Sequence, residues 1–77
     1  MSAFEVGKKY ESCDSGMSPI KIIRRTPKTC LVENNEGTRW RMRIRDIEGD
    51  EMMVDSSVPA KWRGVFTYYS MYEYKEN

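Results

Sequence analysis

The residues with the clearest chemical pattern are four arginines at alternate positions: Arg39, Arg41, Arg43 and Arg45. Large apolar residues fill the positions between them: Trp40, Met42 and Ile44. Because successive side chains of a β-strand point to opposite faces, a strand would place the guanidinium groups on one face and the apolar groups on the other. Neighbouring arginines would then lie about 6.5–7 Å apart, close to the spacing of phosphates along a nucleic-acid strand.

This row predicts a nucleic-acid interface. The candidate binding residues are Arg39, Arg41, Arg43, Arg45, Arg24 and Lys28. Residues 20–45 carry eight basic and two acidic side chains, or +6, whereas the rest of the chain carries five basic and ten acidic ones, or −5. Such segregation indicates one positive and one negative face. Aromatic residues that would offer a stacking surface for unpaired bases are Trp62, Tyr68, Tyr69, Tyr72 and Tyr74.

A plainer interpretation is that the arginines form a solvated charge ladder. Glu33, Glu51 and Asp55 occupy neighbouring segments from which they would pair with the arginines across strands. The net charge of +1 is also small for a nucleic-acid-binding protein. Both tryptophans, Trp40 and Trp62, are more typical of core than of a ligand-stacking surface.

Two further functions stay open, both involving protein partners. An acidic cluster around one hairpin predicts a protein-interaction module or an inhibitor that acts on a host protein; its residues are Asp46, Glu48, Asp50, Glu51 and Asp55. Exposed Met and Tyr side chains also suit such interfaces. Self-association into a homodimer would instead use the strand at residues 65–74, provided that it lies at a sheet edge.

The residue types argue against an enzyme and against cofactors. Histidine is absent, so a Ser or Cys nucleophile lacks its usual base, and two cysteines do not complete a zinc site. We expect Cys13 and Cys30 to be reduced, buried thiols, since a bridge between them would need an oxidising compartment. The first residues lack a signal-peptide pattern and no apolar run approaches the roughly 18 residues of a membrane span, which predicts a cytoplasmic protein without a membrane partner.

Turn signals divide the chain into short strands of one domain, residues 1–77. The expected strands are residues 4–12, 20–25, 28–33, 38–47, 50–55 and 65–74. A helical turn at 58–64, with Trp62 closing one end, favours an all-β, SH3-like barrel of five to six antiparallel strands over an OB-like barrel or a β-sandwich dimer. Met52 and Val54 are expected to share one face, opposite Glu51, Met53 and Asp55. The predicted core is Ile20, Ile22, Val32, Trp40, Met42, Ile44, Val54 and Phe66.

Short motifs along the chain also resemble those of a known group. They are Phe4-x-Val6-Gly7-Lys8-x-Tyr10, Ser12-Cys13-Asp14, Arg25-Thr26-x-Lys28-Thr29, Arg43-Ile44, Gly49-x-Glu51 and Tyr69-Ser70. In these the chain resembles short accessory proteins carried by phages and integrative conjugative elements of Firmicutes. It departs from them in the first loop, where relatives carry another cysteine and an aromatic residue, and in its tyrosine-rich C-terminal segment. The resemblance implies a bacterial or phage origin, a cytoplasmic location and an accessory role, and it transfers no site residue.

Overall fold

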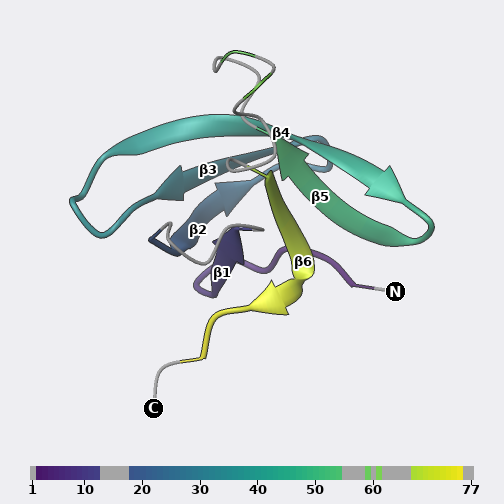
Figure 1. Ribbon diagram of the computed structural model, residues 1–77, viewed down its shortest axis with the longest axis horizontal. Helices are drawn as coiled ribbons and strands as arrows, with labels where there is room; N and C mark the ends of the chain where they lie inside the picture. The colour runs from purple at the N-terminus through teal and green to yellow at the C-terminus, as the bar shows by residue number, and fades with distance from the viewer. Residues whose placement is uncertain (1, 13–17, 55–58, 60, 62–66, 76–77) are drawn as a thin grey trace.

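Six antiparallel strands follow one another around a closed barrel, in the order in which they occur along the chain (Figure 1). The structure is a computed structural model and describes residues 2–12, 18–54, 59, 61 and 67–75. The strands are β1 (Lys9–Ser12), β2 (Ile20–Arg25), β3 (Thr29–Glu33), β4 (Arg39–Ile47), β5 (Asp50–Val54) and β6 (Thr67–Glu73). The predicted all-β, SH3-like barrel of antiparallel strands is therefore confirmed, with β2 at its predicted bounds.

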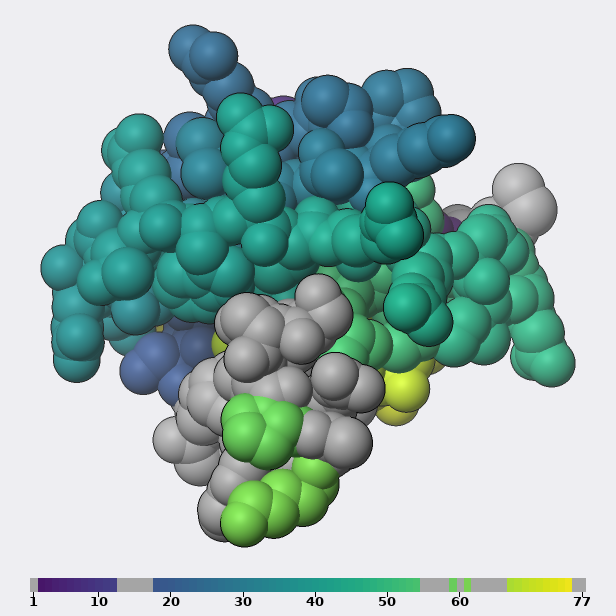
Figure 2. Space-filling view, turned by 90° about the horizontal axis from the view of Figure 1, so that it is seen from above, coloured from purple at the N-terminus to yellow at the C-terminus, as the bar shows by residue number. Residues whose placement is uncertain are grey.

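Strand β4 has the alternation expected from its sequence. All four of its arginines are exposed, while Met42 is buried and Trp40 and Ile44 are half-buried against the core. The outward residues of β4 and β2 occupy neighbouring parts of one surface (Figure 2). The period-two interpretation of this run is confirmed, and with it the separation of apolar core from positive surface.

The core combines predicted side chains with several that the sequence did not indicate. Its fully buried members are Phe4, Tyr10, Ile20, Ile22, Cys30, Val32, Met42, Met53 and Tyr68. Phe4 and Tyr10 pack edge to face, with ring centroids 4.8 Å apart. Predicted core residue Phe66, the helical turn at 58–64 and Trp62 lie outside the described residues, apart from Pro59 and Lys61.

The orientation predicted for β5 is wrong. Met53 lies opposite Ile44 and is completely buried, whereas Val54 lies opposite Arg43 and Met52 opposite Arg45. Val54 is half-buried on the arginine side of the sheet and is not part of the core. The alternation favoured the wrong face because it sets two apolar residues, Met52 and Val54, against a single Met53 between two acids. Met52 is also buried, so both methionines are covered although they lie on opposite faces of the strand.

A β-bulge in β2 changes which way its last residues point. Ile22 pairs with Val32 and Arg24 pairs with Leu31, so Ile23 is an extra residue on this strand. Arg24 is consequently exposed on the outer surface, while Arg25 pairs with the buried Cys30 and turns toward the end of the barrel. Two adjacent arginines therefore lie in different places, Arg24 on the outer surface of the sheet and Arg25 at the end of the barrel.

The segment before β1 closes that end of the barrel. Phe4 is buried, and the backbone N–H of Gly7 donates to the carbonyl of Ile22 at 2.8 Å. Strand β6 pairs with β5 on one side and with β1 on the other. Over the described residues 67–73 it is therefore not an edge strand, which was the condition for the predicted self-association. The homodimer itself stays a prediction.

Candidate nucleic-acid interface

On the outer face, two rows of side chains run across all three of the strands β2, β3 and β4. In one row Leu31 pairs with Arg24 on β2 and with Arg41 on β4. In the other, Glu33 pairs with Lys21 and with Arg39. Positive side chains therefore flank β3 on both sides, and the sheet register brings Arg24 beside the arginines of β4 as predicted from the sequence.

Only one arginine of the β4 row has an ion pair among the described residues. The Nε of Arg39 lies 2.7 Å from Oε2 of Glu33, which is one of the predicted cross-strand pairs. Within the same part of the chain, Arg41, Arg43 and Arg45 have no carboxylate within ion-pair distance. On the neighbouring strands, Arg41 lies opposite Leu31, and Arg45 lies opposite Met52. Arg43 lies opposite Thr29 on one side and Val54 on the other. The charge ladder thus accounts for one guanidinium and leaves three facing solvent.

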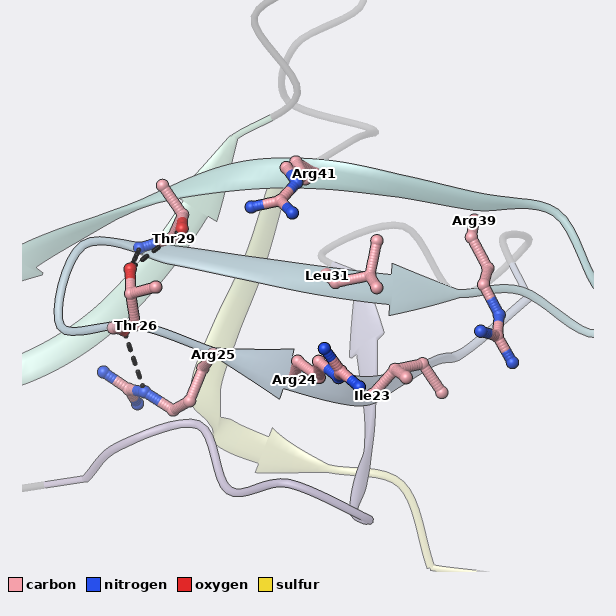
Figure 3. Close-up of a pocket in the computed structure, with 8 residues that line it drawn as sticks. All are labelled: Ile23, Arg24, Arg25, Thr26, Thr29, Leu31, Arg39 and Arg41. Carbon is pink, nitrogen blue, oxygen red and sulfur yellow. Dashed lines mark hydrogen bonds between the residues drawn. The ribbon is translucent and has the colours of Figure 1, made fainter.

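A groove of about 410 Å³ opens on this surface. Its lining consists of Ile23, Arg24, Arg25, Thr26, Thr29, Leu31, Arg39 and Arg41. Figure 3 shows Leu31 on the middle strand, with Arg41 on β4 on one side of it and Arg24 on β2 on the other. The groove therefore has basic sides and an apolar floor.

The β2–β3 turn brings Lys28 to the same surface. The Thr26 hydroxyl accepts hydrogen bonds from the backbone N–H groups of Lys28 and Thr29, at 3.2 and 3.0 Å, which fixes the turn at Pro27. The carbonyl of Lys28 accepts a 2.7 Å hydrogen bond from the N–H of Ile44. Lys28 is exposed beside β4, where the sequence placed it among the candidate binding residues.

Glu51 does not lie in the arginine row, contrary to prediction. Both of its oxygens bind Arg25, at 2.6 and 2.8 Å, and its Oε1 also accepts the N–H of Phe4 at 2.8 Å. Nη1 of Arg25 donates in addition to the Phe4 carbonyl at 2.7 Å. These hydrogen bonds, led by those from Arg25, lower the pKa of the Glu51 carboxyl against the opposing effect of burial. The pair is thus a clamp that holds the N-terminal segment over the barrel end.

The acidic cluster expected around the β4–β5 hairpin is largely engaged within the chain. Asp46 Oδ1 accepts the N–H of Gly49 at 3.2 Å, and Asp50 Oδ1 accepts the hydroxyl of Ser2 at 2.8 Å. Glu51 is neutralised by Arg25. Asp55, which was also predicted to pair with the arginines, lies outside the described residues. Three acids of the cluster therefore make contacts within the chain, while Glu48 is exposed in the β4–β5 turn. An interaction of this hairpin with a protein partner stays a prediction.

The tyrosines fall into two environments. Tyr68 is buried in the core, opposite Met53, and is not available for stacking. Tyr69 pairs across strands with Met52, which in turn pairs with Arg45. The rings of Tyr69 and Tyr72 meet edge to face with centroids 5.6 Å apart. An aromatic pair thus lies two strands away from the end of the arginine row.

Cys30 has the predicted role of a small buried apolar residue and is a free thiol. Burial raises the pKa of this thiol to about 11, against a lowering effect of the nearby Arg25. Cys13 lies outside the described residues. Among the residues that are described, no three His, Cys, Asp or Glu side chains are grouped in a way that could hold a metal ion.

No protein-family model matches the chain. Comparisons with curated proteins and with solved structures also yield no match. Within the described part of the chain, no helix has the length and apolar character needed to cross a membrane. The arginine-bearing surface is therefore the feature of this molecule from which we infer a function.

Proposed function

We propose that this barrel is a non-enzymatic nucleic-acid-binding protein whose β4 arginines contact the phosphate backbone. The observation that carries the proposal is the run of three outward guanidinium groups, Arg41, Arg43 and Arg45, without a carboxylate partner among the described residues. Arg24 extends the positive surface onto β2. Guanidinium groups bind phosphate through paired hydrogen bonds, and their spacing along a strand follows that of a nucleic-acid backbone.

The small net charge of the whole chain does not oppose this function. Lys8 is paired with Glu5 and Glu73, and Arg25 is paired with Glu51, so these opposite charges offset one another outside the arginine row. Among the described residues, the arginines without an acidic partner are Arg24, Arg41, Arg43 and Arg45, and they lie on one face. A local field of this kind, and not the net charge, is what attracts a polyanion at short range.

The test is fluorescence anisotropy with labelled single-stranded and duplex oligonucleotides at 50 and 200 mM salt. Four phosphate contacts, from Arg24, Arg41, Arg43 and Arg45, would release enough counterions to weaken binding about 50-fold for single strands and about 150-fold for a duplex over that range. Absence of binding to either oligonucleotide at 50 mM salt would reject the proposal.

Charge reversal separates the arginine row from general electrostatic attraction. The double variant Arg41→Glu plus Arg43→Glu is expected to abolish binding while the circular dichroism spectrum stays unchanged, because both side chains face solvent. Lys61→Glu plus Lys75→Glu is the matched control, since it changes the net charge equally at exposed positions outside β4. Equal losses in the two variants would show that the row has no special role.

A further inference from the structure

The groove on the outer face contains an apolar strip that phosphate binding does not use. Leu31 and Ile23 are both half-buried within it, and both contribute to its lining. Leu31 separates Arg24 from Arg41, whose Cα atoms are therefore two strand spacings, or about 10 Å, apart. A ligand that consisted of phosphate alone would satisfy the two guanidinium groups and leave the strip facing water.

The groove also has two positive side chains that are available to a ligand. Arg25 is held by Glu51, and Arg39 is bound through its Nε to Glu33. Arg24 and Arg41, in contrast, have no acidic partner among the residues described. Their planar guanidinium groups both bind phosphate and stack on flat rings.

These properties match an unpaired nucleotide. Building on the proposed function, we infer that the groove selects single-stranded nucleic acid by taking one unstacked base against Leu31 and Ile23, between Arg24 and Arg41. The groove volume of about 410 Å³ falls in the range of roughly 300–1,000 Å³ occupied by small-ligand sites. A duplex keeps its bases paired and stacked inside, so it offers phosphates to the arginines but no base to the apolar strip.

The rest of the strand would continue along β4. Arg45 lies four residues beyond Arg41, or about 13 Å, which corresponds to two steps of an extended nucleic-acid backbone. At that point Met52 and then Tyr69 follow Arg45 across the sheet, and Tyr69 contacts Tyr72. A second base would find an aromatic surface there, whereas the groove itself supplies the apolar floor for the first.

An abasic oligonucleotide isolates the contribution of the base. Anisotropy is measured at one salt concentration with a labelled 12-nucleotide single strand, an abasic strand of equal length and the corresponding duplex. We expect the intact single strand to bind about tenfold more tightly than the abasic strand, since base contacts of this kind contribute factors of that size. The abasic strand keeps its phosphates and its salt dependence, so the comparison reports on the groove floor alone.

Variants of Leu31 test whether the base binds at this side chain in the groove. Leu31→Ala removes the floor and is expected to weaken the intact strand about tenfold while leaving the abasic strand unaffected, and Leu31→Trp is expected to tighten the intact strand. Ile47→Ala is the control, because Ile47 is exposed on the far end of β4, outside the groove lining.

These measurements can refute the base-binding groove and the phosphate-binding row separately. Equal binding of intact, abasic and duplex oligonucleotides would overturn the base-binding groove and leave the phosphate-binding row standing. The intact strand could also bind selectively with an affinity that neither Leu31 variant changes. This result would place the base outside the groove and would also overturn the inference. Absence of binding by all three would reject the proposed function itself.

Discussion

Replacing Glu51 by glutamine is expected to destabilise the barrel by about 3 kcal/mol. The substitution keeps the shape of the side chain but leaves Arg25, whose side chain is only 22% exposed, without its counter-charge. Removing one partner of a buried ion pair typically costs about 3–5 kcal/mol, and the partial exposure of this pair favours the lower end. For a domain whose total stability is about 4–12 kcal/mol, this is a large fraction.

The effect is measurable by urea denaturation, followed by tryptophan fluorescence and circular dichroism. A loss of about 3 kcal/mol corresponds to a fall in Tm of about 12–24 °C for a domain of this size. Glu36→Gln is the matched control: Glu36 is an exposed carboxylate in the β3–β4 turn, where a change within about 0.5 kcal/mol is expected. A comparably small change for Glu51→Gln would refute the role assigned to the clamp.

The same clamp determines part of the acid sensitivity. Because the pKa of Glu51 is lower in the folded protein than in the unfolded chain, its stabilising contribution is complete above the unfolded pKa. The contribution is then lost as the pH falls through the lower, folded pKa. The free energy of unfolding of Glu51→Gln should therefore depend less steeply on pH below about 4.3 than that of the parent protein. Parallel curves for the two proteins would contradict the assignment.

Three other predictions test separate features. In a Cys13→Ser background, Cys30 should not react with a thiol reagent at pH 8 until urea unfolds the chain, because burial raises its pKa to about 11; rapid native-state reaction would contradict its burial. Met53→Ala should cost about 2–5 kcal/mol in urea denaturation and Val54→Ala much less, and the reverse order would restore the orientation expected from the sequence. Gly37→Ala should cost about 1–2 kcal/mol by the same assay through backbone strain alone, since its φ is +82° and an added Cβ meets no atom within 4 Å.

Local patterns in the sequence were sufficient to predict most of the strands and the arginine face. Strand β4 has a strict alternation of residue types over seven positions, and the turn at Asn34–Gly37 has residues that tolerate its backbone geometry. Arg24 and Lys28 reach the same surface because the β2–β3 hairpin is short. These features depend on neighbours in sequence, which is why period and turn chemistry predict them.

Other features depend on contacts between distant parts of the chain and had no local signal. Phe4 and Tyr68 enter the core because the ends of the barrel meet, and Glu51 leaves the arginine row because Arg25 and Phe4 lie nearby at the barrel end. The bulge at Ile23 was equally hidden, since a run of two isoleucines and two arginines fits a regular strand as well as a bulged one. Sequence distance, and not residue type, separates what was predictable from what was not.

Because of the single extra residue in β2, two neighbouring positions differ in how freely their residue type can change during evolution. Position 24 lines the groove and takes no part in the closure of the barrel, so changes there are expected to leave folding intact. Position 25 also lines the groove but anchors the N-terminal segment, so changes there are expected to destabilise the folded protein. A descendant of this chain that was selected for folding alone would therefore be expected to lose the first arginine and retain the second.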